Sequence, residues 1–269
     1  MSERIYVLDV SNVQKDIDWR KVIQHDPGEA FGRPPGRIAG VVAKASEGSR
    51  YADPRTEEHL NGARDVGLAL GVYHFARVSG RPLEQADLVL ANAEDQGDGP
   101  GELPIWLDLE EKGAAARLGG PDAYVEWILR FCERVEDRGF RVGIYSAPVY
   151  GAEWRAAQRV AELARWPLWV AQYSRIGKWA PSDTDQPMKL SPWSAWSIWQ
   201  FSGGGPGLPG NTVPGIDGYV DLNLVNGGLE AWRELLGTTP VEPNEPMGAI
   251  IHPDVPLGRA ALDDVEGLS

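Results

Sequence analysis

Two carboxylic acids, Asp108 and Glu110, end a short apolar run that begins at Ile105. Pro104 precedes the run, and a proline fits the entrance to a β-strand but not the interior of a helix. Residues two apart in a strand point to the same side, with Cα atoms about 6.5 Å apart. Two carboxyl groups in a poorly solvated site repel each other, which raises the pKa of at least one of them. Such a pair can supply an acid beside a base or a stabilising charge. The alternative is a helix cap at Asp108 and a solvated Glu110.

Two further acids lie in apolar runs far away in the sequence. Asp9 falls in the first apolar run, and Asp221 lies in the run from Gly218 to Leu222. A single acid in such a place is more often a cap than a catalyst. In a barrel of parallel strands, however, the C-terminal ends of the strands open onto one mouth, where such folds do their chemistry. We therefore expect Asp9, Asp108, Glu110 and Asp221 to converge on one site.

The order of apolar and amphipathic segments predicts the fold that carries these acids. Strand-like runs alternate with helical patterns at first, and consecutive strands follow. The predicted strands are residues 5–10, 38–45, 72–76, 105–108, 141–146, 167–173, 195–201 and 218–222. The predicted helices are residues 18–23, a segment from Pro54, and residues 81–96, 122–138, 150–164 and 229–236. Continuous apolar strands separated by helices indicate a parallel sheet covered by helices. We predict an α/β fold, an irregular TIM-like (β/α)-barrel of about eight strands with an irregular last third.

The composition of the chain changes after the last predicted helix. Residues 1–236 are assigned to the barrel, and residues 237–246 form a linker rich in proline and acids. Residues 247–269 are too few to make a domain of their own, so we expect a short C-terminal tail.

Charge and cysteine content exclude several classes of function. The 269 residues carry a formal net charge of −13, which argues against sequence-independent nucleic-acid binding and against attraction to anionic membranes. The single cysteine, Cys132, cannot form a disulfide within the chain, and no cysteine–histidine cluster has metal-ligand spacing. We expect no metal and no cofactor. No apolar run is long enough to span a membrane, and the first residues lack the pattern of a signal peptide, so synthesis in a cytoplasm is expected.

Polar and aromatic side chains occur on the strands near the predicted mouth. They are Tyr73, His74, Tyr145, Trp169, Gln172, Trp199 and Gln200, with Lys44 and Glu47 after the second strand. Amides, phenols, indoles and carboxylates together suit a polyol ligand and a positively charged transition state. With no second histidine or cysteine nearby, His74 is expected to be a hydrogen-bonding wall residue rather than a proton carrier.

Seven segments of the chain resemble the glycoside hydrolase family 25 lysozymes, the Chalaropsis type that is common among phage endolysins. They are YVLDVSN…IDW (6–19), VVAKASEG…DP (41–54), HLNGARDVGLALGVYHFA (59–76), LPIWLDLEEKG (103–113), VGIYSAP (142–148), LWVAQYS (168–174) and WSIWQFS…GIDGYVDLN (196–223). The family has KATEG more often than KASEG and DVE rather than DLEEKG, and neither difference alters an acid. By position, the resemblance implies that the family's acids are Asp9, Asp108, Glu110 and Asp221, with Glu110 as the general acid.

The resemblance implies an N-acetylmuramidase that cuts the β-1,4 bond between N-acetylmuramic acid and N-acetylglucosamine in peptidoglycan. We expect a monomer made in a host cytoplasm that acts on the glycan strands of the bacterial wall after release. A catalytically silent wall-binding barrel is the alternative. A chitinase is disfavoured because the chain lacks the D-x-x-D-x-D-x-E strand run of chitinase-type barrels.

Overall fold

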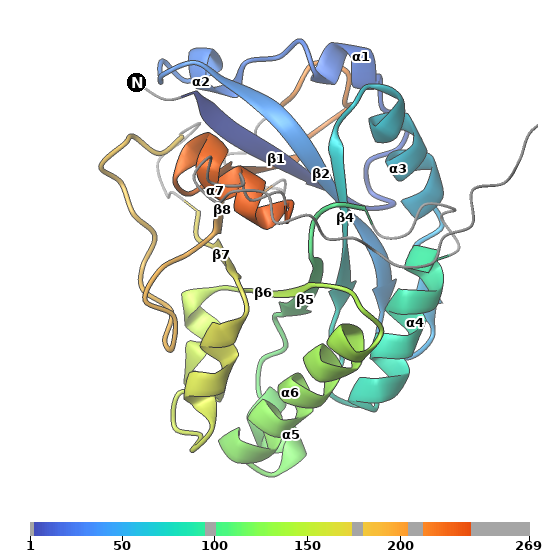
Figure 1. The fold of residues 1–269 in the computed structure, drawn as a ribbon, viewed down its shortest axis with the longest axis vertical. Helices are drawn as coiled ribbons and strands as arrows, with labels where there is room; N and C mark the ends of the chain where they lie inside the picture. Colours follow the sequence, from blue (N-terminus) through green and yellow to red (C-terminus); the bar gives the residue numbers. More distant parts are fainter. Residues whose placement is uncertain (1–2, 95–100, 174–179, 204–211, 238–269) are drawn as a thin grey trace, which may run out of the picture. The chain divides into compact units, whose positions relative to one another are not determined.

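Eight strands close into a barrel in the computed structural model, which describes residues 3–94, 101–173, 180–203 and 212–237 (Figure 1). In order around the barrel they are β1 (Arg4–Val10), β2 (Gly36–Glu47), β4 (Ala69–Phe75), β5 (Ile105–Leu109), β6 (Val142–Ser146), β7 (Leu168–Ala171), β8 (Ile198–Ser202) and β9 (Asp221–Val225). Strand β1 pairs with both β2 and β9, which closes the ring. A short strand, β3 (Tyr51–Ala52), folds back on the end of β2. The predicted α/β barrel is therefore confirmed.

The last strand of the barrel runs against its neighbours. Strands β1 to β8 of the barrel pair in parallel, whereas β9 is antiparallel to both β1 and β8. Asp221 consequently begins its strand instead of ending it, and so reaches the mouth formed by the C-terminal ends of the parallel strands. The predicted irregular last third corresponds to this reversal.

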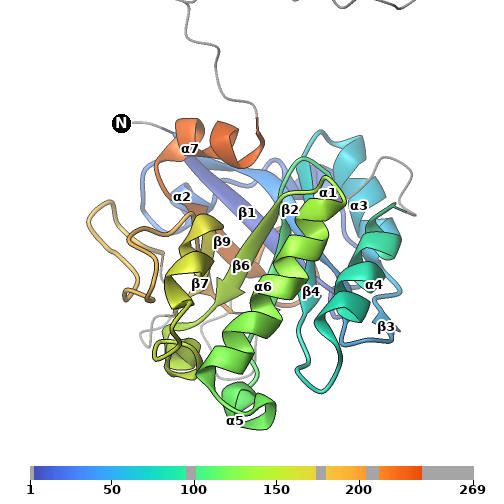
Figure 2. The same cartoon turned by 60° about the horizontal axis from the view of Figure 1, so that its bottom comes forward.

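Helices cover the outside of the barrel. They are α1 (Trp19–Val22), α2 (Pro27–Ala30), α3 (Thr56–Asp65), α4 (Pro82–Glu94), α5 (Ala114–Leu118) and α6 (Pro121–Asp137), and α4 and α6 lie side by side in Figure 2. Helix α6 buries one apolar face that includes Trp127, Phe131 and Cys132. None of the helices in the described part of the chain combines the length and the apolar composition that crossing a bilayer requires.

The predicted helix over residues 150–164 is wrong. The segment forms two 3₁₀ helices, Pro148–Glu153 and Val160–Arg165, with a break between them. At the break the buried Trp154 indole donates to the carbonyl of Ser191 at 2.9 Å. The Glu153 carboxylate accepts from the backbone N–H groups of Gly113 and Ala115. These tertiary contacts outweigh the helix propensity of the segment.

One helix closes the floor of the barrel. Helix α7 (Gly228–Leu235) places Trp232 and Leu235 in the apolar cluster formed by the inward side chains of the strands, which include Val7 and Trp106. The Trp232 ring lies so close to Gly40 that a Cβ atom there would be 2.7 Å from it. The floor is thus packed, and the polar residues are left at the opposite end of the barrel.

Candidate active site

A cavity of about 220 Å³ opens at the C-terminal ends of the parallel strands. All four predicted acids line it. The lining residues are Asp9, Lys44, Tyr73, Phe75, Asp108, Glu110, Tyr145, Trp169, Tyr173, Gln200 and Asp221. The barrel therefore brings together acids that are separated by more than two hundred positions in the sequence.

Asp9 and Asp221 form one pair of acids in this cavity. They are register partners on β1 and β9, and Gln200 Nε2 donates to Asp9 Oδ2 at 3.0 Å and to Asp221 Oδ2 at 3.3 Å. Burial, and then the charge of Asp221, raise the pKa of Asp9 well above its ordinary value, although the hydrogen bonds from Asn223 and Gln200 act against this. The side-chain amide of Gln200 donates to both acids of the pair.

The side chain of Gln200 is fixed from both ends. Its Oε1 accepts from the hydroxyls of Tyr145 at 2.7 Å and Tyr173 at 2.5 Å, while its Nε2 serves the two aspartates. The side chain of Asn223 is likewise held at both of its polar atoms. Its Nδ2 donates to Asp9 Oδ2 at 2.8 Å, and its Oδ1 accepts from the Trp169 indole at 2.7 Å. The amides are therefore structural parts of a rigid site.

Asp108 and Glu110 form the second pair of acids. Asp108 is 5% exposed, and its Oδ1 has no hydrogen-bond partner among the described residues. Burial raises the pKa of Asp108 well above its usual value, the charge of Glu110 raises it further, and Lys44 acts in the opposite direction. Glu110 is half-buried, and burial followed by the charge of Asp221 raises its pKa too. The site therefore shifts both carboxyl groups toward the protonated form relative to their behaviour in water.

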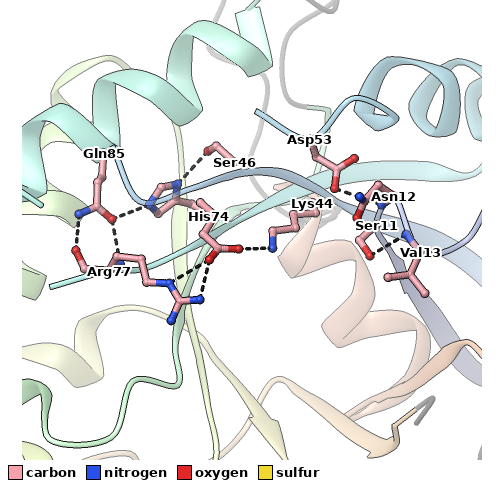
Figure 3. Close-up of polar contacts among 10 residues, drawn as sticks. Ser11, Asn12, Val13, Lys44, Ser46, Asp53, His74, Arg77 and Gln85 are labelled. Carbon is pink, nitrogen blue, oxygen red and sulfur yellow. Dashed lines mark hydrogen bonds and ion pairs between the residues drawn. The ribbon is translucent and has the colours of Figure 1, made fainter. Parts of the chain in front are cut away.

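A row of ion pairs runs from Lys44, which lines the cavity, away to Arg77 (Figure 3). Lys44 Nζ lies 2.6 Å from Glu47 Oε2, and the Arg77 guanidinium donates twice to Glu47 Oε1, at 2.9 and 2.6 Å. Pairing between β2 and β4 skips Ala45, and this bulge lets Lys44 and Glu47 pair with the alternate residues Tyr73 and Phe75. Glu47 itself borders a neighbouring cavity rather than this one.

The structure does not bring His74, Gln172 or Trp199 into the cavity. His74 is fully buried behind the barrel wall, between the Ser46 hydroxyl at 2.8 Å and Gln85 Oε1 at 2.9 Å (Figure 3). Gln172 is bonded to the backbone N–H of Met188, and its carbonyl accepts from the Trp199 indole. The predicted wall role of His74 and Gln172 has no support in this arrangement, because successive residues of a strand face opposite sides.

Sequence reasoning missed Phe75, Tyr173 and Asn223. Phe75 and Tyr173 line the cavity. Phe75 lies two residues beyond the predicted Tyr73, and Tyr173 lies four residues beyond the predicted Trp169. The period of two along a strand was the signal that could have found both. Within the described residues, no group of three or more histidines, cysteines or acids is placed to hold a metal ion.

Comparisons with known proteins agree with this architecture. The sequence profile of the glycosyl hydrolases family 25 matches residues 8–207. The chain is 31% identical to the uncharacterized protein YegX of Escherichia coli K12 over 231 residues, which is 85% of this chain and 72% of that protein. It is 29% identical to lysozyme M1 of Streptomyces globisporus over 240 residues, 86% of this chain and 71% of that protein. The crystal structure of a bacterial lysozyme from Streptomyces coelicolor superposes with a TM-score of 0.64 and 25% identity, covering 87% of this chain and 96% of that one.

Proposed function

Since the chain belongs to the glycosyl hydrolases family 25, we propose that it is a lysozyme: an N-acetylmuramidase that hydrolyses the β-1,4 bond between N-acetylmuramic acid and N-acetylglucosamine in peptidoglycan. The observation that carries the proposal is the presence of Asp108 and Glu110 in one cavity with the pKa of each raised. Glycosidases commonly place two carboxyl groups beside the bond that is cut, and one of them is protonated.

Glu110 is the proposed general acid. It is the more exposed member of its pair, so it can reach a glycosidic oxygen in the cleft. The Tyr145 hydroxyl lies 2.7 Å from Gln200 Oε1 and 3.5 Å from Glu110 Oε1, as a donor toward each oxygen. Its hydrogen bond to Glu110 acts to lower the pKa of that carboxyl group, but burial outweighs it and the charge of Asp221 adds to the effect of burial. The raised pKa supports the acid form of Glu110 before the bond is cut.

Asp108 is the proposed stabiliser of positive charge. As the glycosidic bond breaks, positive charge develops on the sugar, or on an oxazolinium that the N-acetyl group of the substrate forms. An ionised Asp108 is poorly solvated in the empty site, so a cation placed beside it restores a partner that water does not supply. Asp9 and Asp221 are proposed to orient the substrate and to hold the pKa of Glu110 high through the charge of Asp221.

The remaining lining residues suit sugar binding. Tyr73, Trp169 and Tyr173 offer apolar ring surface with polar edges, and Lys44 offers a cation at the rim. We propose that a single copy is active. The alternative, a silent wall-binding barrel, is not favoured because the complete set of acids is present.

The test is the chemistry of the released product. Purified Gram-positive cell walls are digested with the full chain, turbidity is followed, and the soluble fragments are analysed by mass spectrometry. We expect fragments with N-acetylmuramic acid at the reducing end. A reducing-end N-acetylglucosamine would mean that the other glycan bond is cut, and wall binding with no release would support the silent barrel.

A further inference from the structure

A second and larger cavity, of about 770 Å³, lies beside the proposed active site. It is bordered by the turn at residues 48–50, by β3 and by the segment that leads into α4. Charged and hydroxyl-bearing side chains contribute to its wall. Guanidinium groups come from Arg50, Arg77 and Arg81, and hydroxyl groups come from Ser49, Tyr51 and Ser79.

The two cavities share one wall. Glu47 and Arg77 border the larger cavity, whereas Lys44 and Phe75 line the active site. These residues are in direct contact. Glu47 bonds to both cations. The Lys44 ammonium lies 5.2 Å from the centroid of the Phe75 ring, and the Arg77 guanidinium lies 4.4 Å from it. Only the side chains of this shared wall therefore separate a polymer bound in the active site from the larger cavity.

The larger cavity is locally basic in a chain whose net charge is −13. Glu47 is already neutralised by two cations, whose hydrogen bonds lower its pKa although burial acts to raise it. Glu84 pairs with Arg81 at 3.5 Å. Arg50 is exposed, and no ion pair or hydrogen bond joins its side chain to any residue in the described ranges. The Ser49 hydroxyl is buried in the same wall, and no residue in the described part of the chain forms a hydrogen bond with it. An anion with further hydrogen-bonding groups would satisfy these side chains.

We propose that this cavity binds the acidic peptide that the N-acetylmuramic acid residues of the glycan strand carry. The inference rests on the proposed function and adds a second part of the same substrate to it. A wall peptide offers carboxylates for Arg50 and Arg81 and amides for the hydroxyl groups. Because the peptide branches from the sugar chain, it needs a site next to the glycan cleft and separate from it, and the larger cavity has that position.

The experiment compares two substrates and three variants of the full chain. One substrate is soluble peptidoglycan freed of other wall polymers, with its peptides intact. The other is the same material after an amidase has removed the peptides. The variants are Arg50→Ala, Arg50→Glu and the control Arg37→Ala, which removes an exposed arginine at the opposite end of β2.

We expect Arg50→Ala to raise the KM for the peptide-bearing glycan by about three- to tenfold, with kcat unchanged. Arg50→Glu should raise this KM further. Added salt should reduce the difference in KM between each variant and the wild type, because the site is open to solvent. On the stripped glycan, neither variant should differ from the wild type by more than about twofold. Arg37→Ala should match the wild type on both substrates.

Equal effects on both substrates would overturn the proposal, because the cavity would then bind sugar. No effect on either would overturn it as well. If the wild type cuts neither glycan, the proposed function fails, and binding of the two glycans to the wild type and to Arg50→Glu still decides whether the peptide is recognised.

Discussion

Asp9 and Asp221 face each other across β1 and β9, and one amide group, Nε2 of Gln200, donates to both of them. A neutral donor between two acids lowers their repulsion without removing it. The pair therefore retains a preference for one proton, which agrees with the raised pKa of Asp9. Gln200 in turn depends on Tyr145 and Tyr173, so the charge of the acids is tied to the aromatic wall of the cleft.

Gln200→Glu places a third carboxylate between the two aspartates. We expect the free energy of unfolding at pH 7 to fall by about 2–4 kcal/mol, because a buried charge without a partner is added. The new carboxyl group should have a raised pKa in the folded state, so the loss should shrink as the pH falls toward 4. Gln200→Met, which removes the hydrogen bonds without adding a charge, is the control. Chemical denaturation at several pH values measures the free energy of unfolding of both variants. A loss of stability in Gln200→Glu that does not depend on pH would contradict the prediction.

Asp108→Asn should make the protein more stable and less active. Burial and the charge of Glu110 raise the pKa of Asp108 in the folded state. The folded protein therefore gains stability from protonation of Asp108, and this gain is complete at a pH below the pKa that Asp108 has in the unfolded chain. The gain is lost as the pH rises through the higher pKa of Asp108 in the folded protein. A neutral side chain avoids this loss. We expect a gain of about 0.5–2 kcal/mol at pH 7 that vanishes toward pH 4, with loss of wall hydrolysis. The control is Asp18→Asn at an exposed helix cap, where the pKa is lowered by Lys21 and the same change should destabilise.

Much of the site follows from the sequence, because buried strands and their terminal acids leave clear patterns. Applying the alternation of side chains along each strand strictly would have improved the prediction of the residues that line the site. If Tyr73 faces the cavity, then Phe75 does and His74 does not. By the same rule Trp169 implies Tyr173 and excludes Gln172.

Other features depend on contacts that no local pattern records. The reversal of β9 is decided by pairing with β1 and β8, which lie far away in the sequence. The bulge at Ala45 depends on the register between β2 and β4. The break at Trp154 depends on a partner, Ser191, in a distant loop. Tertiary pairing outweighs local preference at each of these places.

Glu110→Gln tests the proposed general acid, and Glu111→Gln is its matched control. We expect kcat for wall hydrolysis to fall by about 10²- to 10⁴-fold in Glu110→Gln with little change in KM. Glu111 accepts from the backbone N–H of Val78 at 2.8 Å and pairs with Arg117 at 2.7 Å, so its substitution should reduce stability and leave kcat nearly intact. In the wild type, kcat should decline as the pH rises through the raised pKa of Glu110. Similar losses of kcat in the two variants would exclude a special role for Glu110.

His74 should make the barrel sensitive to acid. Burial lowers the pKa of His74 to about 4, and the ring is held neutral between Ser46 and Gln85. Because the unfolded chain takes up the proton first, the stability due to the neutral ring is lost as the pH falls from about 6.5 toward 4, by at most about 3 kcal/mol. His74→Gln removes this titration. The difference in unfolding free energy between the wild type and His74→Gln should therefore shrink with acid, and a difference independent of pH would contradict the prediction.

The barrel should need α7 but not the residues that follow it. We predict that residues 1–236 are the catalytic domain, because Trp232 and Leu235 of α7 close the barrel floor against Gly40 and its neighbours. A chain that ends at Leu236 should keep the melting temperature and the kcat for soluble peptidoglycan, so that residues 237–246 act as a linker and residues 247–269 as a tail. Trp232→Ala in the full chain should cost about 3–5 kcal/mol, since it empties the floor of the barrel. Calorimetry and turnover of both proteins test the boundary. If the shortened chain melts early while Trp232→Ala remains stable, the segment after Leu236 belongs to the folded domain and the boundary is wrong.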